Sequence, residues 1–567
     1  MGGPAAGVGS VELDFTTGGT LAPTLLRRLD TIAAREVETF NRFVAGLCVG
    51  RERDIDWWVT RPASRNVHLS PLFRWCMQLS LVRSLLEEGR HLSIRVDVPE
   101  FAAVLRSAAG CTVEVPARGA LLWRLKRLRA HAWNLGSCIF HAVSAATAAR
   151  LTRHLARKPV LGPLVLLDCF VTRESFSGGP FRDRHFPGVV AALSAEERRT
   201  VHYLPMFYRV RSYFRTFRAL RQDPANFLVR EDHLRLVDYL FAAGHWWRVR
   251  RHLGHEAQYC GFDVRALVDA DLRAGRFARS AFLALLAYRF LTTAERRGLA
   301  IARLVNWYEG RDTDHATAAA VNWHRLDIAL IAFRPPCSRF YLSVTPEPYE
   351  VAAGVVPTTV AVVGCGFARE IAAGNPGLAV VPAPGLRLPR PSAATTPEGE
   401  GTAVLVILPL LGAAIAGIRA LIAPTGGMPG ASVQWWIKRH PEMPRTEAEA
   451  LFGSLPSGYR FVEGDFADWL ARAAIVAGVG SSALIEAVAT GRAVLCLASG
   501  NEPTENPIPP WVDGRLWRIA YSPDDVRAAV TDLLHVDDAP RDRAALRNDL
   551  LSPGEPAEMQ RILGFGP

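Results

Sequence analysis

Short runs of apolar, often β-branched residues constrain the fold of this chain more than any other feature of its sequence. In the first two thirds of the chain they occur at residues 91–98, 163–171, 201–210, 299–310, 326–333 and 360–364. Each run is followed by a turn and a helix-like stretch, such as residues 100–109 after the first run. Strands that alternate with helices indicate βαβ units and a parallel sheet covered on both faces.

A second series of such runs begins after a change in composition. Residues 375–401 hold six Pro and four Gly among 27 residues, which is typical of a linker. Further strands are predicted at residues 403–408, 433–438, 459–462, 474–477 and 493–497. The sequence therefore predicts two α/β lobes, residues 1–375 and residues 402–567, joined by a linker at residues 376–401.

The composition excludes several classes of protein. With 49% hydrophobic and 21% charged residues, the chain is no disordered tail, collagen-like rod or simple coiled coil. The nine cysteines are scattered without a C-x-x-C pair, which favours reduced thiols in a cytosolic protein over a disulfide framework or a zinc site. The net charge of +11 permits several anionic partners. No RRM, KH, helix-turn-helix or zinc pattern is present, so no nucleic-acid partner is expected.

Two uncharged stretches approach the length of a membrane span. Residues 351–368 and 402–418 both carry Pro and Gly in their interiors, and about 20 clean apolar residues are needed to cross a bilayer. Each is therefore predicted to form a buried strand followed by a turn. The N-terminal residues lack a basic region followed by an apolar one, so no signal peptide is predicted.

Residues 115–167 stand apart because they contain no Asp or Glu, but nine Lys or Arg. Within this segment Leu121, Leu122, Leu125 and Leu128 fall at helical spacing beside the basic residues. A basic amphipathic helix with a Trp fits a membrane surface that carries anionic lipid. A solvated basic face packed on its own lobe explains the same pattern. Contact of residues 115–158 with the inner face of the cytoplasmic membrane therefore stays open.

The second predicted lobe holds the most specific motifs. Its strand at 433–438 ends in Lys438, Arg439, His440 and Pro441, and the carboxyl end of a parallel strand is where open α/β sheets place ligand contacts. Three donor side chains at this point suit a phosphate, and the proline fixes the turn.

A second motif follows the strand at 474–477. Gly480, Ser481 and Ser482 lead into a helix at residues 483–490, and Glu486 lies about one turn after Ser482. The amide groups of a helix start and two hydroxyls form an anion site, and the carboxylate suits ribose hydroxyls. Serine is also a common N-cap and a lone histidine is often structural, but the two motifs together favour binding of a nucleotide phosphate.

These residues carry a family resemblance. The sequences KRHP at 438–441 and GSSALIE at 480–486 resemble the HP and SS motifs of bacterial GT-B glycosyltransferases that use CMP-activated sugars, among them sialyltransferases and Kdo transferases. The segments 56–73, 304–316 and 341–350 resemble a family of bacterial surface carbohydrate biosynthesis proteins. Residues 356–367 are similar to the segment that closes the acceptor lobe of Kdo transferases.

The resemblance implies a GT-B fold, in which two Rossmann-like lobes with parallel sheets face a central cleft. It implies that His440, Ser481 and Ser482 contact the phosphate and ribose of CMP, and that no metal or other cofactor is required. The D-x-D spelling at residues 312–314 lies at a predicted helix entry, which makes it a weak metal candidate.

Transfer also needs a general base on the first lobe. Related sialyltransferases use the first acid of a D/E-D/E-G triplet, and here Tyr308, Glu309 and Gly310 match that triplet only in part. We expect Glu309 to be the base, with Asp312, Asp168 or Glu174 as alternatives.

Acceptor contacts are predicted in two places. Two adjacent tryptophans beside charged side chains suit sugar stacking and hydrogen bonding. The candidates in this cluster are Asp56, Trp57, Arg65 and Asn66. A buried strand edge would explain the same residues. Asp168 ends a predicted strand, so we expect it either to face the cleft between the lobes or to cap a helix or turn. Arg182, Arg184 and His185 are expected to meet an anionic sugar or lipid diphosphate, or else to belong to a solvated loop.

The sequence therefore predicts transfer of an acidic sugar, Kdo or another ulosonic or sialic-type acid, from CMP to a bacterial surface polysaccharide or lipid-linked acceptor. His440 and Glu309 are the predicted catalytic residues. A polyol-phosphate transferase that uses CDP-glycerol is the nearest alternative. A catalytically silent scaffold for glycan assembly is the alternative from another class.

Overall fold

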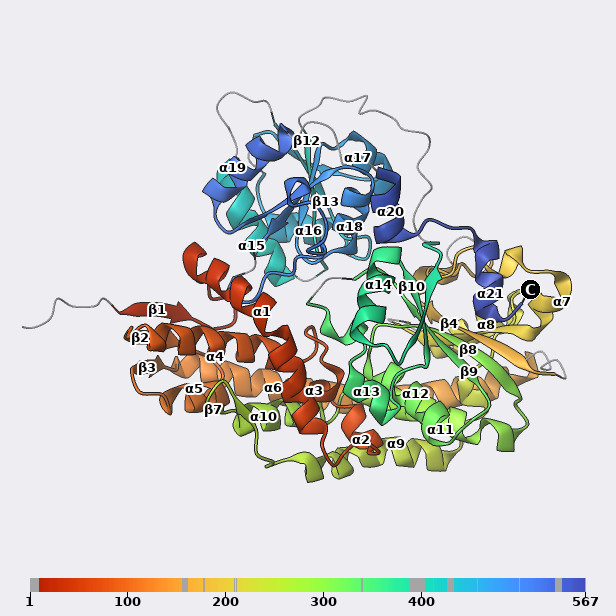
Figure 1. Ribbon diagram of the computed structural model, residues 1–567. Coiled ribbons are helices and arrows are strands. Elements are labelled where there is room, and N and C mark those ends of the chain that lie inside the picture. The colour runs from red at the N-terminus through yellow and green to blue at the C-terminus, as the bar shows by residue number, and fades with distance from the viewer. Residues whose placement is uncertain are drawn as a thin grey trace, which may run out of the picture.

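The computed structural model describes residues 10–155, 162–176, 179–208, 210, 212–337, 340–386, 403–410, 412–425, 433–455, 457–498, 500–535 and 543–565. Two six-stranded sheets, both entirely parallel, dominate the architecture (Figure 1). A three-stranded parallel sheet and a short antiparallel pair complete it. This confirms the predicted α/β class with two Rossmann-like lobes.

The first six-stranded sheet forms the central lobe, in the order β11-β10-β9-β8-β4-β5. Its strands are β4 (Leu164–Val171), β5 (Val201–Phe207), β8 (Ile301–Trp307), β9 (Ala329–Arg334), β10 (Thr359–Val363) and β11 (Ala379–Ala383). Strand order reverses between β4 and β8, which is where doubly wound sheets bind ligands. β11 lies inside the segment predicted as a linker, so this sheet extends to residue 383. Residues 387–401 of that segment lie outside the described residues.

The second six-stranded sheet forms the C-terminal lobe, in the order β14-β13-β12-β15-β16-β17. Its strands are β12 (Ala403–Ile407), β13 (Gln434–Lys438), β14 (Tyr459–Val462), β15 (Ile475–Gly478), β16 (Ala493–Leu497) and β17 (Trp517–Ala520). Counted along the chain, this is the 3-2-1-4-5-6 order of a dinucleotide-binding sheet, and its reversal lies between β12 and β15. The sheet is buried on both faces, and the adjacent Trp435 and Trp436 of β13 enter different core clusters.

The N-terminal residues form a separate unit, which the sequence did not predict. The strands β1 (Val11–Asp14), β2 (Leu92–Arg95) and β3 (Cys111–Glu114) pair in parallel. Helices α1 (Pro23–Cys48), α2 (Ile55–Trp58), α3 (Arg61–Ser64), α4 (Leu72–Glu87) and α5 (Pro99–Arg106) accompany them. The run at 91–98 was expected in the main sheet of its lobe but lies in this smaller one.

The remaining helices cover the two large sheets. In the central lobe they are α6 (Ala117–Thr152), α7 (Ala195–Thr200), α8 (Tyr213–Gln222), α9 (Leu236–Arg248), α11 (Arg279–Ala294), α12 (Asp312–Trp323), α13 (Pro348–Ala353) and α14 (Cys365–Gly374). α10 (Arg265–Gly275) packs instead on α3, α4 and α5 of the N-terminal unit. The antiparallel pair β6 (Gln258–Tyr259) and β7 (Phe262–Asp263) places the ring of Tyr259 against that of Phe43 in α1. In the C-terminal lobe they are α15 (Gly412–Ile422), α16 (Arg445–Phe452), α17 (Phe466–Arg472), α18 (Ser482–Ala489) and α19 (Pro523–Leu534). Both uncharged stretches contain the predicted buried strand and turn, β10 and β12. Within the described residues, no helix is long and apolar enough to cross a membrane.

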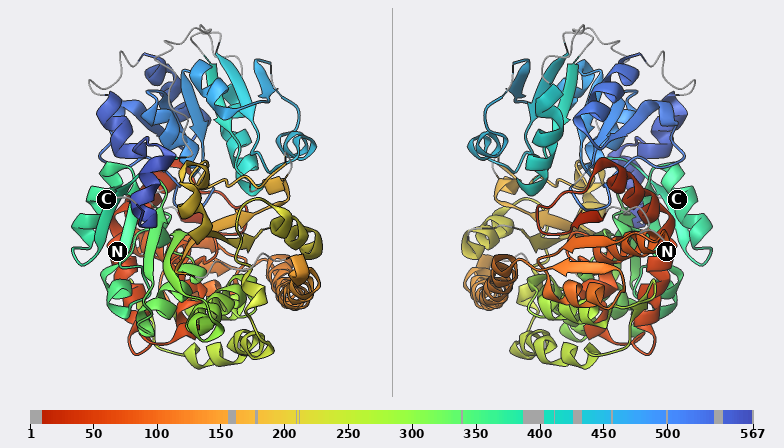
Figure 2. Two further views of the ribbon diagram at one scale, coloured as in Figure 1. Left: turned by 90° about the vertical axis from the view of Figure 1, so that its right-hand side faces the viewer. Right: turned by 90° about the vertical axis from the view of Figure 1, so that its left-hand side faces the viewer.

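The last helices return from the C-terminal lobe to the central lobe (Figures 1 and 2). α20 (Arg543–Leu551) packs between α14 and α18, and α21 (Met559–Leu563) packs against β8. Gly364, with a φ of +93°, lets the backbone of α20 approach, because a Cβ there would lie 2.7 Å from the carbonyl oxygens of Asp549 and Leu550. The lobes are therefore joined by packed helices as well as by the linker.

The turn after β8 shows why a glycine follows Glu309. Gly310 has a φ of +62°, and a Cβ on it would lie 1.6 Å from the carbonyl oxygen of Ser343. Gly298 has a φ of +76°, but a Cβ there would meet nothing within 4 Å. The two glycines thus share a backbone conformation and differ in the space around them.

We predict that Gly310→Ala lowers the free energy of unfolding by at least about 3 kcal/mol, since a left-handed alanine and a steric clash both destabilise the fold. Gly298→Ala, the matched control, is expected to cost about 1 kcal/mol for its backbone conformation alone. Urea unfolding followed by circular dichroism measures both. Equal losses would contradict the close approach at Gly310.

Candidate functional site

The two large lobes line an open pocket of about 50 Å³. From the central lobe it is lined by His185, Trp307, Phe333, Pro335, Pro336, Val363, Gly385 and Leu386, and from the C-terminal residues by Ser482, Glu486 and Leu551. Most of the first group lie at the carboxyl ends of β8, β9 and β10, and the second group includes the start of α18. Both sheets thus turn the ends of their strands to one cleft, which is the arrangement of a GT-B fold.

The start of α18 lies at the strand-order reversal of the C-terminal sheet. β15 ends at Gly478, where a Cβ would lie 2.6 Å from Ile407, so the two central strands approach closely there. Ser481 is the N-cap, and its hydroxyl accepts a hydrogen bond from the Ala483 amide at 3.3 Å. Ser482 is exposed and lines the cleft together with Glu486. Ser481 therefore has the capping role, and Ser482 is the hydroxyl open to a ligand.

The basic side chains after β13, at residues 438–441, form hydrogen bonds and an ion pair within the C-terminal lobe. Arg439 forms an ion pair with Glu463 at 3.1 Å, and its NH1 donates to the Met443 carbonyl at 2.7 Å. The Lys438 ammonium donates to the Gly464 carbonyl, and burial lowers the pKa of Lys438. Both cations contact the loop after β14, and their role as phosphate ligands stays a prediction. Pro441 is exposed in the following turn.

His440 lies in the turn after β13, two residues before Glu442. Its Nδ1 accepts a hydrogen bond from the Glu442 amide at 3.1 Å, so in the neutral ring Nε2 carries the proton. Glu442 in turn forms an ion pair with Arg184 of the central lobe at 2.9 Å. β13 and β15 are separated only by β12, and their ends lie at the same level, so the two strand ends are about 10 Å apart.

The loop that carries Arg184 also places His185 in the cleft. The ring of His185 lies 4.1 Å from that of Trp307 and 4.9 Å from that of Phe170, measured between centroids. Arg184 bridges the lobes by its ion pair with Glu442 rather than standing free for a sugar. His185 is thus an imidazole held between two aromatic rings, opposite Ser482 and Glu486.

Glu309 lies behind this wall of the cleft. One carboxylate oxygen accepts hydrogen bonds from Trp307 Nε1 at 3.0 Å, and the other from the Tyr341 hydroxyl at 3.0 Å. Arg311 forms an ion pair with it. Because both oxygens are bound by neighbouring donors, Glu309 orients Trp307 and is poorly placed to accept a proton from a substrate. The structure therefore argues against the expected role of Glu309 as base.

A group of buried carboxyls lies at the strand-order reversal of the central sheet. Burial raises the pKa of Asp183 and of Asp314 to about 6. Burial, followed by the nearby charge of Asp314, raises the pKa of Asp168 well above its usual value. Asp168 is 6% exposed and lies outside the lining of the cleft, so it does not have the predicted acceptor contact. Asp312 is buried at the start of α12, and the side chain of Glu174 lies outside the described residues.

One pair at the cleft escaped the sequence analysis. His68 of the N-terminal unit lies with its Nδ1 3.5 Å from a carboxylate oxygen of Glu505. Glu505 packs under the turn before α18, because the Gly480 amide donates to its carbonyl at 2.9 Å and a Cβ on Gly480 would strike its carboxylate. Burial raises the pKa of Glu505. Nothing local in the sequence connects these two residues.

The predicted acceptor cluster of the first lobe is buried. Asp56, Trp57, Arg65 and Asn66 are each only 1% or 2% exposed. Burial alone would raise the pKa of Asp56, but hydrogen bonds from His245 and Arg248 hold it below its usual value. Arg65 forms an ion pair with Glu350 at 2.7 Å. This corrects the prediction of acceptor contact, because aromatic residues beside charged ones equally well encode a buried ion-pair network.

Comparison with known proteins adds fold-level likeness only. No protein-family model and no curated protein matches the sequence. Similar solved structures include an S. aureus MnaA–UDP co-structure, with 12% identity, a TM-score of 0.39, and coverage of 70% of this chain and 95% of that one. A UDP-GlcNAc 2-epimerase from Neisseria meningitidis bound to UDP-GlcNAc shows 10% identity, a TM-score of 0.39, and 70% and 98% coverage. MurG from Acinetobacter baumannii shows 12% identity and a TM-score of 0.36, with coverage of 71% of this chain and 99% of that one. At these scores we take neither donor nor reaction from them.

We predict that Arg65→Met lowers the free energy of unfolding by about 3–5 kcal/mol, because Glu350 is then buried without its partner. Any folded fraction should bind ligands of the cleft as the wild type does. Arg35, whose side chain is 73% exposed, offers the control, and Arg35→Met is expected to stay within about 0.5 kcal/mol. Thermal unfolding measures both variants. A stable Arg65→Met protein that uses the acceptor poorly would instead support the predicted contact of Arg65 with the acceptor.

Proposed function

We propose that this protein is a glycosyltransferase that binds a nucleotide-activated sugar on its C-terminal lobe. The observation that carries the proposal is the cleft itself, in which Ser482 and Glu486 of α18 face His185 and Trp307. The dinucleotide-type strand order puts the start of α18 at the point where such sheets bind ligands. A helix N-terminus favours an anion, so the donor phosphate is assigned to this position.

The chemistry of the donor rests on the HP and SS motifs. They support CMP as the nucleotide and an acidic sugar, Kdo or another ulosonic or sialic-type acid, as the group transferred. His440, with its proton on Nε2, donates to the departing phosphate from one side, and Ser482 from the other. Glu486 accepts hydrogen bonds from the ribose. The acceptor is a hydroxyl of a bacterial surface polysaccharide or of a lipid-linked glycan.

We assign the base to His185 in place of Glu309. The acceptor oxygen attacks the anomeric carbon and loses its proton to the His185 imidazole, while the bond between that carbon and the phosphate oxygen breaks. CMP leaves with the electron pair, and donors placed where that charge develops accelerate the step. Trp307 holds the imidazole plane, and Glu309 fixes Trp307 through its indole N–H. None of these steps uses a metal, so EDTA should leave the rate unchanged.

A ligand panel tests the nucleotide. Thermal unfolding is measured with CMP, CDP, UDP, GDP, ADP and CDP-glycerol, and we expect CMP to stabilise the protein selectively, because only a ligand of the folded state raises Tm. Selectivity for CDP-glycerol would support a polyol-phosphate transferase instead. Indifference to every nucleotide would contradict the proposal and favour a silent scaffold in glycan assembly.

We predict that His440→Ala lowers turnover of the CMP-activated sugar by at least roughly tenfold, the scale of one lost charge-stabilising donor. Its Tm should stay close to that of the wild type, since His440 is only partly buried. His535, exposed at the end of α19 in the same lobe, gives the control variant His535→Ala. Wild-type turnover in His440→Ala would remove this residue from the mechanism.

A further inference from the structure

The long helix α6 exposes apolar side chains that no part of the described chain covers. It spans 36 residues, and the exposed fractions of its large apolar side chains reach 67% at Leu128 and 75% at Trp133. The others exposed on it are Leu121, Leu122, Leu125, Ile139, Phe140, Val143 and Leu151. Contiguous exposed apolar surface of this kind marks an interaction site.

Helix α9 continues this surface. Leu236, Val237, Leu240 and Trp247 are 56–72% exposed on it. The two helices meet at Phe277, whose ring lies 5.5 Å from His131 of α6 and 5.3 Å from Trp246 of α9. We call these exposed side chains of α6 and α9 the α6–α9 face. Figure 2 shows α6 end-on in orange, at the outer edge of the molecule and below the C-terminal lobe.

The charge of the α6–α9 face has one sign. Neither helix carries an acid except Asp238, which is fully buried and ion-paired with Arg289 and Arg297. Arg124, Lys126 and Arg129 stand exposed between the leucines of α6. Burial, and then the nearby charges of Arg250 and Arg127, lower the pKa of Arg276 at the junction of the helices.

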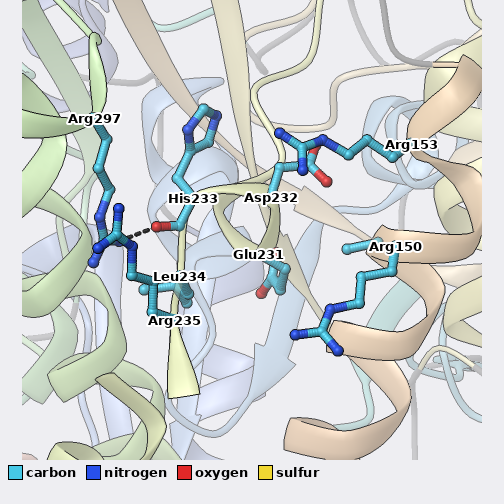
Figure 3. A pocket seen from close by; sticks show the side chains of 9 residues that line it. Arg150, Arg153, Glu231, Asp232, His233, Leu234, Arg235 and Arg297 are labelled. Atoms are coloured by element: carbon cyan, nitrogen blue, oxygen red, sulfur yellow. Dashed lines mark hydrogen bonds between the residues drawn. The ribbon is translucent and has the colours of Figure 1, made fainter. Parts of the chain in front are cut away.

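A polar pocket of about 400 Å³ opens at the end of this face (Figure 3). Arg150 reaches it from the last turn of α6, Arg153 from the residue directly after α6, and Arg235 from the residue before α9. Among the described residues these three arginines form no ion pair. The two acids of the pocket are both paired, Asp232 with Arg221 at 2.8 Å and Glu231 with Arg230 at 3.4 Å. The neighbours Leu151, Leu236 and Val237 are exposed. Unpaired guanidinium groups next to apolar side chains suit a phosphate that carries an acyl chain.

We propose that the α6–α9 face docks on a bilayer that contains anionic phospholipid, and that the arginine pocket receives a headgroup phosphate. The apolar side chains enter the acyl boundary, the two exposed tryptophans lie at the headgroup level, and the basic residues meet the lipid charge. A folded protein partner would need acids opposite the basic residues and is the less favoured occupant. The proposal is independent of the nucleotide, so its test needs no glycosyl donor.

Co-sedimentation with vesicles tests the docking. The full chain is mixed with phosphatidylcholine vesicles that contain or lack phosphatidylglycerol, at low and high salt. We expect binding that requires phosphatidylglycerol and weakens as the salt concentration rises. Each basic residue near the membrane surface is attracted by the lipid charge, and salt screens this attraction. Lys126→Glu with Arg129→Glu should weaken it at least tenfold, and Arg150→Ser with Arg153→Ser at least about fivefold.

Control variants separate docking through the α6–α9 face from the effects of changing the net charge or removing an exposed leucine elsewhere. Arg445→Glu with Arg515→Glu changes the net charge by the same amount on exposed residues of the C-terminal lobe and should bind as the wild type does. Leu125→Ser with Leu128→Ser should weaken binding, whereas Leu451→Ser, on an exposed leucine of α16, should not. Circular dichroism confirms that each variant is folded.

Three results would overturn the proposal. One is binding that ignores phosphatidylglycerol, and another is undiminished binding by the α6 variants. The third is a dimer in size-exclusion chromatography that Leu125→Ser with Leu128→Ser converts to a monomer while no form binds vesicles. That result would assign the α6–α9 face to a second copy of the chain.

Discussion

The direction of the strands governs the rest of this structure. In a parallel sheet buried on both faces, side chains along the strands are committed to the core, and polar groups collect where the strands end. Both large sheets direct those ends toward each other, so the cleft gathers the exposed histidine, serine and carboxylate side chains of two distant parts of the sequence. His185 and Ser482 meet for this reason, although almost 300 residues separate them.

The relation of the lobes to each other follows from contacts outside the cleft. α20 packs against helices of both lobes, and the Ser552 hydroxyl after it accepts a hydrogen bond from the Gly364 amide at 3.2 Å. On the other side, Asp30 of the N-terminal unit accepts a hydrogen bond from the Tyr521 hydroxyl at 2.7 Å. The pair of Arg184 and Glu442 spans the cleft directly. Together these contacts hold the start of α18 opposite the wall formed by Trp307 and His185.

The sequence predicted the large sheets well, because continuous apolar runs such as those of β4 and β12 are long enough to show their period. It missed β1 and β3, which have only four residues each and little apolar periodicity. It found Ser482 and Glu486 because the chain between them is a single helical turn. It misassigned Asp56 and Arg65, since burial of an ion pair depends on partners such as His245 and Glu350 that lie far away in the sequence. The contact of His68 with Glu505 was missed for the same reason, because the two residues lie far apart in the sequence.

The return of the chain to its first large lobe has a consequence for how the protein is made. Met559, Ile562 and Leu563 of α21 are part of the same apolar cluster as β4, β5 and the end of β8. During synthesis these residues leave the ribosome only after the whole C-terminal lobe has emerged. The apolar cluster of the central lobe is therefore completed only when the last helix of the chain has emerged.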